Sequence, residues 1–75
     1  MSGRPVKRSL TLSGHKTSVS LEDEFWEVFR EIALAEGQTL NGLAAEIDAG
    51  RGDVGLASAI RVFVLGRLRA EAQSE

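Results

Sequence analysis

The feature that most constrains this chain is a change of periodicity at Leu21, where alternating residues give way to helical spacing. Residues 15–21, HKTSVSL, alternate in polarity. One side carries Thr17, Val19 and Leu21, and the other carries Lys16, Ser18 and Ser20. This pattern predicts a half-buried β-strand. The backbone groups of a strand need hydrogen-bond partners, so a second strand has to come from this chain or from another molecule.

A helix is predicted directly after this strand. The acids Glu22, Asp23 and Glu24 suit a helix N-terminus, where the helix dipole favours negative charge. Ser20, with Asp23 three residues later, resembles a capping box, which would end the strand at Ser20. Gly37 is a natural left-handed residue after a last turn, so the helix is expected to stop at Glu36. Its apolar positions recur with helical spacing: Phe25, Trp26, Val28, Phe29, Ile32 and Ala33.

Two further helices are predicted towards the C-terminus. Thr39 offers a side-chain oxygen as N-cap for a second helix, which the glycine-rich AGRGDVG segment ends. The apolar face of that helix comprises Leu40, Leu43, Ala44 and Ile47. A third helix is expected over about residues 56–72, and it is apolar nearly all round. A helix with so little polar surface requires burial on several sides, which in a short chain indicates contact with another subunit.

The size and composition of the chain exclude several classes of protein. A domain of 75 residues often needs a disulfide, a metal or a second copy for stability, and this chain contains no Cys and only one His, His15. We therefore predict no metal site, no cofactor and no catalytic residue, and we do not expect an enzyme. The basic N-terminus is not followed by the apolar stretch of a signal peptide, and no apolar run approaches about 18 residues, so a cytoplasmic protein without membrane contact is expected.

Charge is distributed unevenly along the sequence. The net charge is −2, yet the first 20 residues carry four bases and no acid: Arg4, Lys7, Arg8 and Lys16. Residues 21–50 carry most of the acids. A surface that binds phosphate should therefore involve the N-terminal segments, where no carboxylate repels an anion. Residues 1–8 are expected to form a basic flexible arm, and residues 9–75 the folded domain.

The order of these features resembles the ribbon-helix-helix family of bacterial DNA-binding proteins, to which the Arc and methionine repressors belong. The likeness is carried by KTSVSL (residues 16–21), by Phe25, Phe29 and Ile32, by Gly37, and by TLNGL (residues 39–43). More narrowly, the segments GHKTSVSLEDEFW, REIA, EID and SAIRVFVL are similar to a short alphaproteobacterial-type branch with an additional C-terminal helix.

The resemblance implies a mainly α fold with a short N-terminal β-strand. That strand would pair with the same strand of a second chain, and the resulting antiparallel ribbon would enter the major groove of double-stranded DNA. The implied homodimer core comprises Val19, Leu21, Phe25, Phe29, Ile32, Leu43, Ile47, Ile60, Phe63 and Val64. The base-contacting positions would be Lys16, Ser18 and Ser20. Phosphates would be contacted by Thr39, Leu40 and Asn41, with Arg4, Lys7 and Arg8 of the arm adding to them.

Two structural alternatives are open at this point. Leu10 and Leu12 alternate ahead of the ribbon, and Ser13-Gly14 could turn the chain, so an intrachain hairpin could supply the partner strand. In addition, SAIR (residues 58–61) resembles the opening of the family's second helix, and the phosphate clamp would then move to Ser58.

Three functions fit the resemblance. The first is a homodimeric transcriptional regulator that binds DNA. The second is the antitoxin of a toxin–antitoxin pair, in which the third helix or the tail would cover a toxin. The third is a protein-interaction module of the same fold that does not bind DNA, which the overall acidic balance and the two serines on the ribbon would permit.

Overall fold

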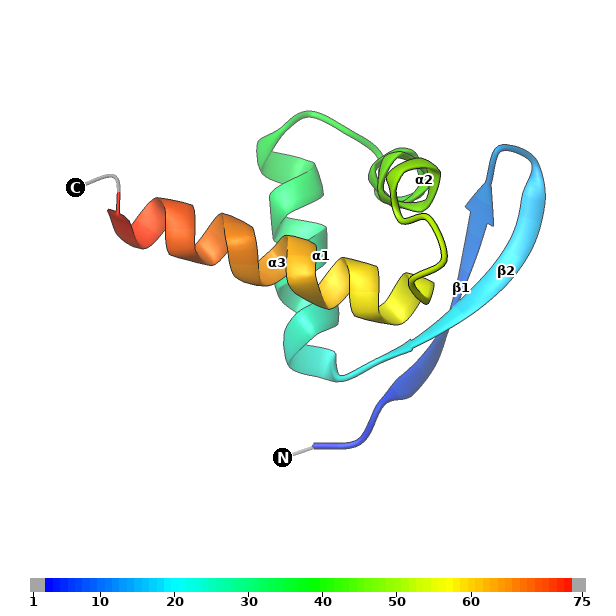
Figure 1. Cartoon of the computed structure of the whole chain (residues 1–75), viewed down its shortest axis with the longest axis horizontal. Coiled ribbons are helices and arrows are strands. Elements are labelled where there is room, and N and C mark those ends of the chain that lie inside the picture. Colours follow the sequence, from blue (N-terminus) through cyan, green and yellow to red (C-terminus); the bar gives the residue numbers. More distant parts are fainter. Residues whose placement is uncertain (1–2, 74–75) are drawn as a thin grey trace.

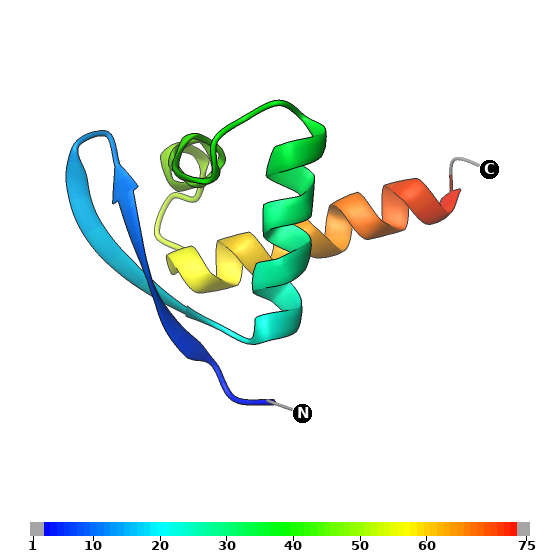
Figure 2. The ribbon, with the colours of Figure 1, turned by 180° about the vertical axis from the view of Figure 1, so that it is seen from behind.

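A computed structural model describes residues 3–73 as a two-stranded hairpin followed by three helices (Figure 1). Strands β1 (Val6–Leu12) and β2 (His15–Leu21) precede α1 (Asp23–Ala35), α2 (Leu40–Gly50) and α3 (Leu56–Gln73). The hairpin lies on one side of the molecule, next to α2 and the first turns of α3, while α3 crosses α1 (Figures 1 and 2). The fold is therefore mainly helical, with a ribbon, two helices and the additional third helix that the sequence predicted.

The hairpin is closed by a two-residue turn. Ser13 and Gly14 both have positive φ angles, 51° and 86°, which is the signature of a type I′ turn between antiparallel strands. Glycine adopts such an angle without steric cost, and the turn matches the twist of the strands it joins. The ladder runs from Leu12 opposite His15 to Val6 opposite Leu21.

The partner of β2 is therefore a strand of the same chain. Residues 6–12 form the intrachain hairpin that the sequence left open as an alternative. The ribbon shared between two subunits, which the resemblance implies, stays a prediction. The physical reason is local, because Leu10 and Leu12 are buried beside Val19 and Leu21 and only two residues separate the strands, so little chain entropy opposes closure. Residues 6–8 of the predicted arm belong to β1, and residues 1–2 and 74–75 lie outside the described residues.

The ends of α1 differ in part from prediction. Strand β2 continues to Leu21, and Glu22 is the N-cap of α1, with no side-chain capping bond. The predicted capping box of Ser20 is thus wrong, since Ser20 stays in the ladder opposite Lys7. At the other end, α1 stops as predicted. Gly37 has a φ of 68°, and the Gln38 N–H donates to the Ala33 carbonyl at 2.9 Å.

The core is formed within one chain. Phe29, Leu21, Leu43, Ile60 and Val64 are its largest fully buried side chains. The residues predicted to form a core between two subunits are buried or partly buried here among helices and strands of a single subunit.

The third helix is only partly covered. Ile60 and Val64 are buried, whereas Val62, Leu65 and Leu68 are exposed by 68%, 54% and 45%. We call these three residues the α3 apolar surface. Within one chain α3 is buried on one side, whereas burial on several sides was predicted, and the α3 apolar surface faces solvent.

Candidate nucleic-acid interface

The hairpin has one face turned to the core and one to solvent. Its inner face carries Leu10, Leu12, Val19 and Leu21, all buried. Its outer face carries six exposed polar side chains, three from each strand: Lys7, Ser9 and Thr11 from β1, and Lys16, Ser18 and Ser20 from β2. We call these six residues the outer ribbon face. The strict alternation of each strand puts every one of them on the same side.

The structure brings the predicted base-contacting residues together and adds neighbours to them. Lys16 lies opposite Thr11, Ser18 opposite Ser9, and Ser20 opposite Lys7. The sequence reasoning assigned Lys7 to the arm and did not assign Ser9 or Thr11 to any site. The alternation of VKRSLTL (residues 6–12), with leucines at every second position, was the signal that could have placed them.

The outer ribbon face contains two ammonium groups, four hydroxyls and no carboxylate. Ammonium groups donate to phosphate oxygens and to the O6 and N7 acceptors of guanine, and hydroxyls both donate and accept. A two-stranded ribbon also has the width that a DNA major groove admits. In chemistry and in shape, this face suits duplex DNA.

Arg8 lies on the other side of the hairpin. Its guanidinium forms an ion pair with Asp23, in the first turn of α1, and lies 5.1 Å from the centroid of the Trp26 ring. The side chain therefore links β1 to α1, and its positive charge is compensated by Asp23. The predicted phosphate contact of Arg8 stays untested, and we leave this residue out of the interface. Arg4, which precedes the ribbon, is exposed.

The N-terminus of α2 adjoins the ribbon. The Thr39 hydroxyl accepts a hydrogen bond from the Gly42 N–H at 3.0 Å, as its predicted capping role requires. Asn41 Oδ1 accepts a hydrogen bond from the backbone N–H of Thr11 at 3.0 Å, which joins the first turn of α2 to β1. That turn contains no acid, and the first N–H groups of a helix attract anions. The predicted phosphate clamp of Thr39, Leu40 and Asn41 thus lies beside the ribbon.

The alternative clamp residue, Ser58, is exposed in the first turn of α3. The helix that carries it is tied to the start of α1, because Arg61 donates hydrogen bonds to a Glu22 carboxylate oxygen at 2.9 and 3.1 Å and to the Ser20 carbonyl at 3.4 Å.

A comparison with protein families agrees with this arrangement. The family model described as the ribbon-helix-helix domain matches residues 5–68, which include both strands, α1, α2 and most of α3. The chain belongs to the ribbon-helix-helix domain family. No curated protein and no solved structure gives a significant match to it. The match begins at Pro5, so the family's pattern includes β1 as well as β2.

At the junction of β2 and α1 of this ribbon-helix-helix domain, one carboxyl group has a shifted pKa. The pKa of the Glu22 carboxyl lies below its ordinary value, because its own backbone N–H donates to it and because the Arg61 guanidinium donates to it. Glu22 is therefore ionised at neutral pH, and its charge is compensated by Arg61. This carboxylate, which follows the ribbon directly, is held by α3.

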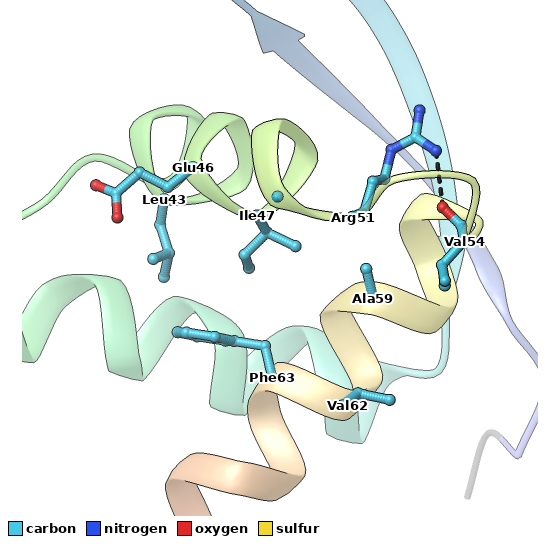
Figure 3. Close-up of a pocket in the computed structure, with 9 residues that line it drawn as sticks. Leu43, Glu46, Ile47, Arg51, Val54, Ala59, Val62 and Phe63 are labelled. Atoms are coloured by element: carbon cyan, nitrogen blue, oxygen red, sulfur yellow. Dashed lines mark hydrogen bonds between the residues drawn. The ribbon is translucent and has the colours of Figure 1, made fainter.

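A groove between α2 and α3 is the main hollow away from the ribbon (Figure 3). Leu43 and Ile47 of α2 face Phe63 of α3, and Arg51 donates to the Val54 carbonyl at 2.7 Å at one end of the groove. Its volume is about 500 Å³, and its lining is mostly apolar. Val62 lines this groove and also a second hollow that includes Leu65 and Leu68, so the apolar area continues across α3.

Residues 3–73 contain neither a metal-binding cluster nor a membrane-spanning helix. No group of three or more His, Asp or Glu side chains in this part of the chain is arranged to hold a metal ion. No helix among the same residues has the length and hydropathy needed to span a membrane.

Proposed function

We propose that this ribbon-helix-helix domain is a DNA-binding transcriptional regulator whose hairpin enters the major groove. The observation that carries the proposal is the outer ribbon face, which has two lysines, four hydroxyls and no carboxylate and lies next to the N-terminus of α2. Lys16, Ser18 and Ser20 would contact base edges. The N–H groups of the first turn of α2 would hold a phosphate at the rim of the groove.

The overall acidity of the chain does not oppose this proposal, because the outer ribbon face carries no acid and the two acids that directly follow β2 are ion-paired, Glu22 with Arg61 and Asp23 with Arg8. The outer residues of α1 include Glu24, Glu27 and Glu31, which are exposed on a different element. Charges separated by more than about 8–10 Å are largely screened at physiological salt, so a local basic surface can bind DNA on an acidic protein.

The proposal is tested by fluorescence anisotropy. A duplex from the region upstream of the gene and a scrambled duplex would each be titrated at several salt concentrations. We expect tighter binding of the upstream duplex, with a log–log salt slope of about −0.9 for each phosphate neutralised. Lys16→Glu is expected to weaken binding about 10-fold or more, since a lysine contact with a base edge contributes about 1–3 kcal/mol.

Arg30→Glu is the matched control for this experiment. It makes the same change in net charge at an exposed position on α1, where Arg30 forms an ion pair with Glu27 at 3.4 Å. We expect its affinity to stay within about 2-fold of the parent value, because exposed ion pairs of this kind contribute little. Equal losses in the two variants, or no binding of either duplex at low salt, would refute the proposed interface and favour a protein-interaction module.

We also propose that two copies associate through α3. The α3 apolar surface continues into the α2–α3 groove, so a second copy related by a two-fold axis could place its own Val62 in or beside this groove. Of the core residues that the resemblance assigned to the dimer, seven are buried within one chain, while Phe25, Ile47 and Phe63 are partly buried. Ile47 and Phe63 line the groove beside the α3 apolar surface, so they would take part in this contact.

Val62→Glu is expected to abolish this association, because it would bury an unpaired charge at the centre of the contact. Light scattering over a range of protein concentrations would measure the mass. Leu34→Glu is the matched control, since Leu34 is 82% exposed on α1 and lines a hollow that shares no residue with the two hollows along the α3 apolar surface. A parent protein that stays monomeric at every concentration would contradict the proposal, as would a dimer that survives Val62→Glu.

A further inference from the structure

The two strands of the hairpin repeat the same types of residue on their outer face. VKRSLTL (residues 6–12) and HKTSVSL (residues 15–21), aligned at an offset of nine residues, are identical at three of seven positions. On the outer ribbon face the equivalent residues are Lys7 with Lys16, Ser9 with Ser18, and Thr11 with Ser20. All three outer positions therefore repeat in chemical type, as lysine, serine and a hydroxyl residue.

The pairing register makes this repeat symmetrical. Lys7 lies opposite Ser20, Ser9 opposite Ser18, and Thr11 opposite Lys16. In an antiparallel ladder, a two-fold axis through the central Ser9–Ser18 pair carries each residue of β1 onto the residue nine positions later in β2. In the observed register, this axis superimposes all three outer residues of β1 on those of β2.

Packing does not account for the symmetry. The six outer residues are exposed, so packing against the core does not constrain which residues occupy these positions. The inner face meets different helices at its two strands, and there the repeat is weaker. Arg8 is ion-paired with Asp23, whereas its equivalent, Thr17, is exposed and polar. The symmetry is therefore most complete on the side that faces solvent.

We infer that one chain carries a complete, two-fold symmetric reading unit for duplex DNA, in which Lys7 and Lys16 have equivalent roles on opposite DNA strands. This inference rests on the proposed function and extends it. Ser9 and Thr11 join the contact face as the counterparts of Ser18 and Ser20. The family resemblance implies a ribbon with one strand from each of two chains, whereas here a single chain contributes both strands.

The spacing of the lysines specifies the kind of DNA site. Along the ribbon, the Lys7–Ser20 pair and the Thr11–Lys16 pair are four residues apart, or about 13 Å at about 3.3 Å per residue. That distance corresponds to about four base pairs at about 3.4 Å each. Lysine pairs with guanine O6 and N7. The site of one hairpin should be a short inverted repeat with a guanine on each strand, about four base pairs apart.

The inference is tested with duplexes selected from a random pool by the parent protein. Anisotropy would compare Lys7→Gln, Lys16→Gln and, as a control that removes the same charge elsewhere, Arg30→Gln. We expect the two lysine variants to lose affinity by similar factors, about 5- to 20-fold each, and Arg30→Gln to change it by less than about 2-fold. The selected duplexes should contain the inverted repeat, and replacing one guanine should remove the effect of only one lysine variant.

The outcomes separate this inference from the proposed function. If Lys16→Gln weakens binding while Lys7→Gln behaves like Arg30→Gln, the symmetric unit is wrong and the DNA-binding function stands. If the selected sites show no inverted repeat, the same conclusion holds. If the parent protein selects no duplex at all, the proposed function itself fails. Circular dichroism of each variant would confirm the fold, which substitutions at exposed strand positions should leave unchanged.

Discussion

Phe29→Ala is expected to lower the free energy of unfolding by about 3–5 kcal/mol, the range found for large-to-small changes at fully buried aromatic positions. Phe29 is 0% exposed, and its ring lies edge-on to Phe63, with centroids 6.5 Å apart and an interplanar angle of 90°. It also lies 6.2 Å from the Trp26 ring, so it joins α1 to α3 and adjoins the indole that contacts Arg8. A domain of this size has a total stability of about 4–11 kcal/mol, so the substitution should remove from about a quarter to all of it.

Urea denaturation followed by Trp26 fluorescence measures this effect, because Trp26 is the only tryptophan and lies next to the altered side chain. Leu34→Ala is the matched control on the same helix. Leu34 is 82% exposed, and its truncation should change the free energy of unfolding by less than about 0.5 kcal/mol. A loss below about 1.5 kcal/mol for Phe29→Ala would mean that the helices do not pack around this ring.

The helices of this domain could be predicted from sequence because their signals are local. The apolar spacing after Leu21, the left-handed Gly37 and the capping hydroxyl of Thr39 each act within a few residues, and all three have the predicted role in the structure. The third helix followed from an uninterrupted run of helix-compatible residues. Its mixed exposure did not follow, because which side of an apolar helix is covered depends on how α1 and α2 cross it.

The sequence left the source of the second strand open, and the intrachain hairpin has a physical explanation. The sequence contains both a strand that can pair with its own copy and a neighbouring segment that can pair with it in the same chain. The likeness to the family favoured the first arrangement. Pairing within the chain loses little entropy because only two residues connect the strands, whereas pairing between chains costs the entropy of association.

The candidate site was predicted in part. Alternation placed Lys16, Ser18 and Ser20 on one face, and they do share one in the structure. The same rule applied to β1 would have put Arg8 with Leu10 on the inner face and Ser9 with Thr11 on the outer one. The basic arm was instead read as a single charged segment, and net charge does not distinguish a residue that faces solvent from one that pairs with Asp23.

Ser9→Cys combined with Ser18→Cys is expected to form a disulfide within one chain and to stabilise the domain. The two residues are directly opposite each other, and opposed residues in an antiparallel pair have Cα atoms about 4.5–5.5 Å apart, a distance that a disulfide spans. The chain has no other Cys. Constraining the unfolded chain should raise the free energy of unfolding by about 2–4 kcal/mol, measured by urea denaturation with and without reductant.

Electrophoresis without reductant decides between the two origins of the ribbon. With an intrachain hairpin, the oxidised double variant runs as a monomer, and the single variant Ser18→Cys forms no linked dimer, because its neighbour across the ladder is Ser9 of the same chain. With a ribbon shared between subunits, two copies of β2 would pair, and Ser18→Cys alone would give a covalent dimer. The second pattern would refute the hairpin and, with it, the symmetric reading unit. It would leave a DNA-binding ribbon of two chains in which Lys16 is present twice and Lys7 has no role.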